Sequence, residues 1–131
     1  MKRIILPVIA LLCVCLLQAQ DYEYPGLKQM LKGNYEAVQK DIDKHLSKDA
    51  DDVPYLFAAA KLYSTDDYSG RDIPKAYKYI CDCKSKFTHL EPAAQDKLIA
   101  KGLTKELLNT SIHEVCSLAL KDAEAVNTEE A

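Results

Sequence analysis

The chain has no tryptophan, two phenylalanines and few residues that break helices. Its 131 residues include four glycines and five prolines. A β-sandwich or a β-barrel needs many tight turns, which these two residues supply, so their scarcity argues against both folds. Alanine, leucine, lysine and tyrosine are abundant instead. The composition therefore predicts an all-α protein.

Long apolar runs are confined to the N-terminus. Two basic residues precede the run Ile4 to Leu17, and polar residues with a small Ala19 follow it. The run is shorter than the roughly 20 residues of a membrane-spanning helix, and this order of segments is typical of a secretory signal peptide. We expect a periplasmic or secreted product with no membrane span after cleavage. The predicted organisation is a signal peptide at 1–19, one helical domain at 20–126 and a polar C-terminal stub at 127–131.

Basic residues are neither in excess nor clustered. The chain has 17 lysines and arginines against 20 acids, giving a formal net charge of −3, and cleavage of the leader removes two of the bases. Proteins that bind nucleic acid contact phosphates with clustered lysine and arginine. We therefore expect no nucleic-acid partner.

Catalytic motifs are also missing. The sequence has no Gly-x-Ser-x-Gly, no phosphate-binding glycine loop and no cysteine paired with a histidine base. The pair His113-Glu114 lacks the second histidine of a zinc protease, because Ser117 stands in its place. The acid-rich stretches 49–52 and 66–72 lack the spacing of a calcium loop. We expect no enzyme, no cofactor and no metal.

Three cysteines follow the leader: Cys81, Cys83 and Cys116. Cys83 and Cys116 each continue an apolar helical stripe, so we expect both to face the core. A disulfide between them in an oxidising compartment is one alternative, and buried free thiols are the other. Cys81 and Cys83 project about 200° apart around a helix, so they cannot converge on a zinc ion together with His113 and Cys116.

Apolar periodicity predicts five or six helices. The clearest stripe joins Ala76, Ile80, Cys83 and Phe87, which recur at i, i+4, i+7 and i+11. Asp51 or Asp52, and later Thr104, are suited to cap the helices that follow them. The expected helices are a short one before Gly33, then Tyr35 to Leu46, Pro54 to Tyr63, Ile73 to Phe87, Pro92 to Lys101, and a last one after Thr104.

Two stretches carry a resemblance to a known family. The run Leu31 to Ala37 resembles the turn of a tetratricopeptide repeat, and Ala58 to Tyr79, with its longer loop, resembles the related Sel1-type variant. The resemblance implies stacked antiparallel helical hairpins, as in the N-terminal helical portions of exported Gram-negative envelope proteins. It assigns structural repeat positions to Gly33, Tyr35, Ala37, Tyr63, Gly70, Ala76 and Tyr77.

Stacked hairpins usually provide binding surfaces. We expect a non-catalytic interaction or scaffold module of the bacterial cell envelope with a protein partner, and self-association is left open because the repeat is unfinished. One alternative is a module for a cell-wall glycan or peptide, bound by Tyr55, Tyr68 and Tyr79. The other is a small periplasmic redox or metal-handling protein that uses Cys81 and Cys83.

Overall fold

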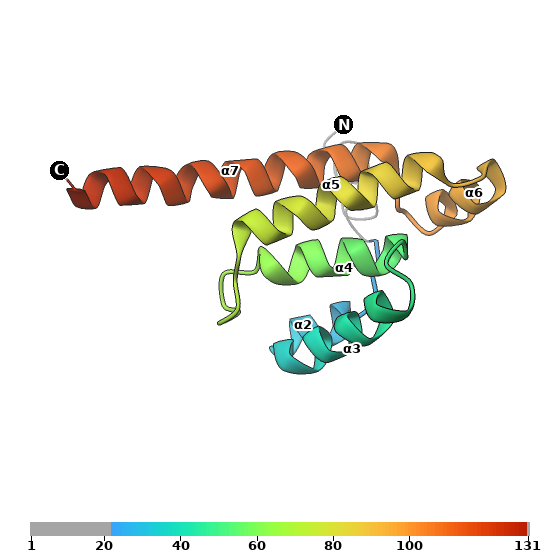
Figure 1. The fold of residues 1–131 in the computed structure, drawn as a ribbon, viewed down its shortest axis with the longest axis horizontal. Helices are drawn as coiled ribbons and strands as arrows, with labels where there is room; N and C mark the ends of the chain where they lie inside the picture. Colours follow the sequence, from blue (N-terminus) through green and yellow to red (C-terminus); the bar gives the residue numbers. More distant parts are fainter. Residues whose placement is uncertain (1–21, 131) are drawn as a thin grey trace, which may run out of the picture.

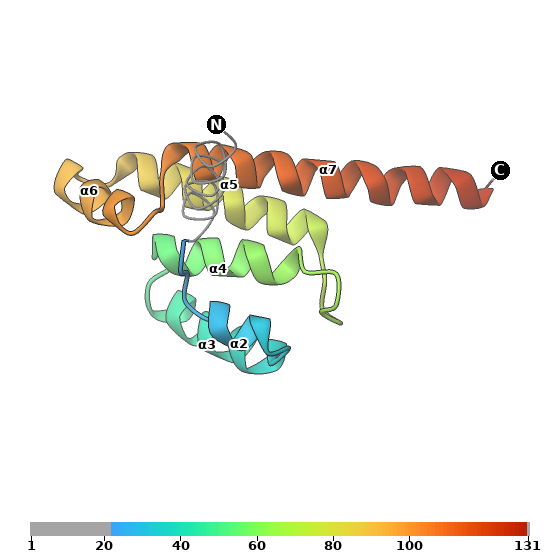
Figure 2. The same cartoon turned by 180° about the vertical axis from the view of Figure 1, so that it is seen from behind.

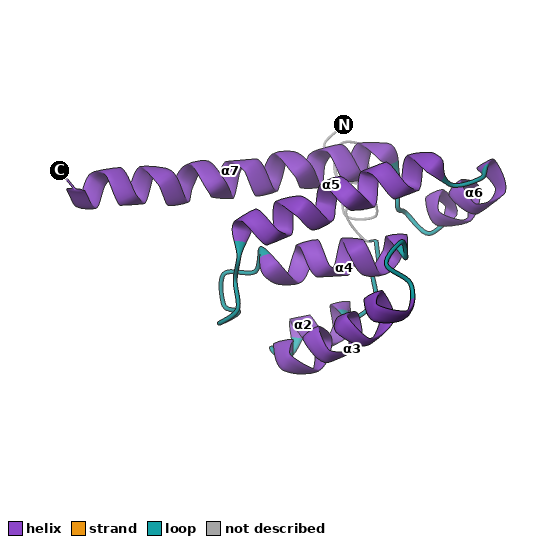
Figure 3. Ribbon diagram, viewed as in Figure 1, coloured by secondary structure: helices purple, strands orange, loops and turns teal. Residues whose placement is uncertain are grey.

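The computed structural model describes residues 22–130, and side chains through residue 127. The predicted leader and its cleavage site lie outside the described residues. All secondary structure that the described part contains is helical, as predicted (Figure 3). The six helices are α2 (Leu27–Leu31), α3 (Tyr35–Lys48), α4 (Val53–Tyr63), α5 (Ile73–His89), α6 (Pro92–Ala100) and α7 (Lys105–Glu130).

Local sequence signals explain where the longer helices begin. Asp52, Asp72 and Thr104 each accept a hydrogen bond from the backbone N–H three residues later, at 3.4, 3.1 and 3.1 Å. These bonds satisfy N–H groups that have no partner inside the helix. Pro54 and Pro74 lie in the first turns of α4 and α5, where the missing proline N–H costs nothing.

Successive long helices run antiparallel and lie side by side (Figures 1 and 2). α4 packs between α3 and α5, and α7 returns along α5. The short α2 lies against α3, whereas α6 forms the far end of the connection between α5 and α7. The arrangement places α4 in the middle, and one side of α7 has no neighbour among the described helices.

The core is centred on α4, because helices cover it on two sides. Eight of its eleven residues are buried, including Phe57, Leu62 and three consecutive alanines. Small alanine side chains let neighbouring helices approach closely. The neighbouring α5 contributes the stripe that its spacing predicts: Ala76, Ile80, Cys83 and Phe87 are all fully buried.

Two tyrosines near the start of the described chain belong to this core. The ring of Tyr22 lies edge-on to Phe57 at 5.2 Å, and the ring of Tyr24 lies edge-on to it at 5.4 Å. Burial raises the pKa of both hydroxyls to about 12. The segment just before α2 is therefore held by aromatic packing.

Several positions taken from the repeat resemblance do not have the environment that it implies. Ala37 and Tyr77 were expected between helices, but both are exposed, Tyr77 by 47%. No described element crosses closely at Gly33, since a Cβ there would meet nothing within 4 Å. Its φ of 79° instead provides the left-handed turn between α2 and α3. Tyr63 and Ala76 are buried, and Tyr35 is partly buried against the core.

The last helix is longer than the sequence suggests. α7 has 26 residues and continues through Glu130, so most of the expected polar stub is helical. Its C-terminal half projects beyond the ends of α4 and α5 (Figure 1). Every side chain from Ala119 to Asn127 is exposed. None of the described helices combines the length and the apolar composition that a bilayer crossing requires.

Candidate interaction surface

An apolar groove lies between α5 and α7. It has a volume of about 650 Å³. Its lining is formed by Ile73, Pro74 and Tyr77 of α5 and by Val115, Cys116, Ala119, Leu120 and Asp122 of α7. Among the described side chains, five large apolar ones are strongly exposed. Tyr77 and Leu120 lie in the groove, and Val126 follows it on α7. Three of the five therefore lie at this groove or on the part of α7 that follows it.

The spacing of apolar residues on α7 explains the groove. Ile112, Cys116, Ala119, Ala123 and Val126 follow one another at intervals of four, three, four and three residues, so they share one face of the helix. The first of them is partly buried against the core, whereas the last four are exposed. The apolar face thus continues along α7 past the level at which the antiparallel α5 begins.

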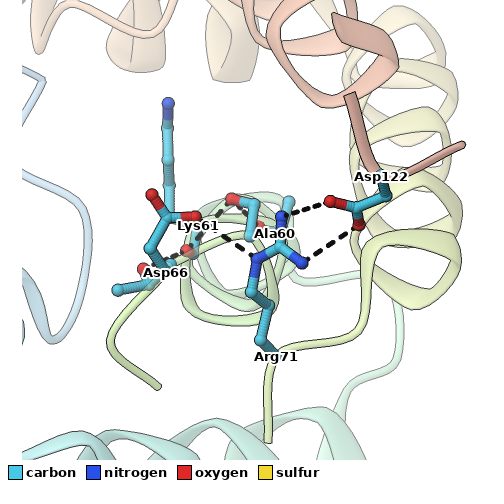
Figure 4. Close-up of polar contacts among 7 residues, drawn as sticks. Ala60, Lys61, Asp66, Arg71 and Asp122 are labelled. Atoms are coloured by element: carbon cyan, nitrogen blue, oxygen red, sulfur yellow. Dashed lines mark hydrogen bonds and ion pairs between the residues drawn. The ribbon is translucent and has the colours of Figure 1, made fainter. Parts of the chain in front are cut away.

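Asp122, which lines the groove, is bound by Arg71 from the loop between α4 and α5. The two terminal nitrogens of Arg71 donate to the carboxylate of Asp122 at 3.0 and 3.3 Å, and its Nε lies 3.4 Å from Asp66 Oδ1 (Figure 4). The hydrogen bond to Asp122 raises the pKa of the guanidinium above its usual range. This two-point contact ties the loop to α7 at the level where α5 begins.

The three tyrosines of the alternative glycan or peptide module have separate environments. Tyr68 is buried, and its hydroxyl donates to the side-chain oxygen of Gln39. Tyr79 stacks on Tyr63 with the ring centroids 5.8 Å apart. Tyr55 stacks on the imidazole of His45 at 4.0 Å and donates to Asp41. Tyr68 is therefore not a surface residue.

The burial of Tyr68 has a specific cause. Its ring lies 5.8 Å from that of Tyr35 on α3 and 5.9 Å from that of Tyr63 on α4. A Cβ on Gly70 would lie 2.6 Å from its Cζ and hydroxyl oxygen. The glycine lets the loop fold over the ring, and the ring connects three elements. The polar loop sequence gave no sign of this contact.

The cysteines also differ from expectation. Cys83 is fully buried, 3.5 Å from the carbonyl oxygen of Val53, and burial raises the pKa of its thiol to about 12. Cys116, expected in the core, is exposed in the groove, and Cys81 is partly buried. All three are free thiols. Because Cys83 faces α4 and Cys116 lies on the groove side of α7, the pairing of these two does not fit the structure.

The side chains that could ligate a metal ion are not brought together in the described part of the chain. No three histidine, cysteine, aspartate or glutamate side chains there are grouped so that they could hold a metal ion. His113 is exposed on α7, whereas Cys83 is enclosed between α5 and α4.

The exposed apolar face of α7 is the main feature that sequence reasoning missed. Its signal was a stripe continuing for ten residues after Cys116. Comparisons of the chain with protein-family models, with curated proteins and with solved structures find no match.

Proposed function

We propose that the chain is an exported, non-catalytic helical protein that binds a protein partner in the bacterial cell envelope. The observation that carries the proposal is the apolar groove between α5 and α7 with its continuation along α7. Large exposed apolar patches on a protein surface typically mark interaction sites. Export is supported by the apolar N-terminal run, with bases before it and Ala19 after it.

The proposed occupant is one face of an amphipathic helix. The lining is almost entirely apolar, and its single carboxylate, Asp122, already accepts from Arg71. A polar or charged ligand would therefore lose its hydration without gaining partners. From Cys116 to Val126 the seam rises about 15 Å, which matches a partner helix of about three turns.

The alternative of a cell-wall glycan or peptide module is less well supported. Its three tyrosines do not share one surface, since Tyr68 is buried beneath the loop. A redox or metal site made of Cys81 and Cys83 is disfavoured by the burial of Cys83.

A photo-crosslinking amino acid placed at Leu120 tests the groove in intact producing cells. The matched control is Leu31, which is 79% exposed on α2, away from the groove. We expect a specific heterologous protein to be captured from position 120 and absent from position 31. Capture of nothing, or of the same proteins from both positions, would contradict the proposal, and capture of a second copy would favour self-association instead.

Affinity measurements then show whether Leu120 contacts the captured protein or only lies near it. Leu120→Asp should weaken binding of the captured protein by about tenfold or more, because a buried leucine typically contributes about 1.5–3 kcal/mol. Leu31→Asp should leave the affinity unchanged. Both residues are exposed in the free chain, so neither substitution should alter the circular-dichroism spectrum.

A further inference from the structure

Two of the three thiols lie on the same side of the contact between α5 and α7. Ile80 of α5 and Val115 of α7 are both buried and line one small cavity. Cys81 and Cys116 are the next residues in each helix, rotated by about 100°. Because α5 and α7 run antiparallel, these equal rotations bring both side chains to the same flank (Figure 1).

The side chain of Tyr77 marks that flank. It precedes Cys81 by one helical turn on α5, and it lines the groove together with Cys116. A hydrogen bond with Cys81 raises the pKa of the Tyr77 hydroxyl, and the nearby Cys116 raises it further. Both thiols therefore lie near one hydroxyl group.

Accessibility separates this pair from the third cysteine. Cys116 is exposed and Cys81 is partly buried, so reagents can reach the flank. Cys83 is fully buried against the opposite side of α5. Disulfide exchange requires an accessible thiolate, which Cys83 does not offer.

We propose that Cys81 and Cys116 form an intramolecular disulfide bond in an oxidising compartment. Each Sγ–H loses its proton, one Sγ–Sγ bond forms, and two electrons pass to an external disulfide, which is reduced to two thiols. The bond joins α7 to α5 beside the groove and closes a loop of about 35 residues. The inference does not depend on the proposed partner, since the bond forms within the isolated chain.

The test uses the full chain with Cys13→Ala and Cys15→Ala, reduced and then treated with glutathione disulfide. Cleavage on the amino side of aspartates places the three remaining cysteines on the separate peptides 72–81, 82–95 and 96–121. We expect a monomer in which peptides 72–81 and 96–121 are linked, while Cys83 alone is alkylated after denaturation. Oxidation should raise the melting temperature by on the order of 10 °C.

Single substitutions make the assignment specific. Cys81→Ser and Cys116→Ser should each abolish the linked peptides, whereas Cys83→Ala should retain them. Alkylation of all three cysteines after oxidation would overturn the proposal. A link to peptide 82–95, or disulfides formed only between chains, would overturn it as well.

Discussion

Replacement of Gly70 by alanine tests how tightly the loop packs over Tyr68. The added Cβ would lie 2.6 Å from the tyrosine Cζ and hydroxyl oxygen, well inside van der Waals contact. The ring has little room to move, because it is 6% exposed and contacts the rings of Tyr35 and Tyr63. Overpacking of this kind typically costs about 1–3 kcal/mol, which corresponds to a melting temperature lower by roughly 5–15 °C.

Urea unfolding followed by circular dichroism measures this cost. Gly33→Ala provides a contrast, since its Cβ meets nothing and its cost of about 1–2 kcal/mol comes from the positive φ alone, so this cost should be the same with and without the Tyr68 ring. In a Tyr68→Ala background, Gly70→Ala should cost less than about 0.5 kcal/mol, because the clashing ring is gone. The reasoning fails if Gly70→Ala is as stable as the parent, or if its cost is the same in both backgrounds.

Two further predictions concern the core. Phe87→Ala should lower the free energy of unfolding by about 3–5 kcal/mol in urea titrations, because it empties a fully buried site, whereas the exposed Leu31→Ala should change it by less than about 0.5 kcal/mol. The pKa of Tyr22 is about 12 in the folded state against 10 when exposed, so the unfolded chain releases this proton first. The associated stability is present below pH 10 and is lost as the pH rises toward 12. Between about pH 9 and about pH 11.5, the free energy of unfolding of Tyr22→Phe should therefore fall by about 2 kcal/mol less than that of the parent, measured by urea unfolding at each pH. An equal loss in both proteins would show that this hydroxyl is not perturbed.

Much of the helical organisation could be predicted because its signals are local. Asp52 and Thr104 cap helices through bonds to residues three positions away, and spacing alone identifies the α5 stripe from Ala76 to Phe87. Such signals depend on a few neighbouring residues, which the sequence displays directly.

The candidate site could not be predicted in the same way. Periodicity shows that Cys116, Ala119 and Ala123 share one face of a helix, but it does not show where the neighbouring helix ends. Here α5 begins beside Asp122, so the rest of that face has no neighbour among the described helices. The burial of Tyr68 was equally hidden, because it depends on the convergence of α3, α4 and the loop.

The packing of Tyr22 against Phe57 has a practical consequence for producing the protein. The cleavage after Ala19 that the sequence predicts would leave only Gln20 and Asp21 ahead of the buried ring of Tyr22. A cut a few residues further along would remove that ring. An affinity tag joined to the N-terminus would begin next to the buried core. Tags and fluorescent reporters are therefore better joined at the C-terminal end of α7, which projects away from the other described helices (Figure 2).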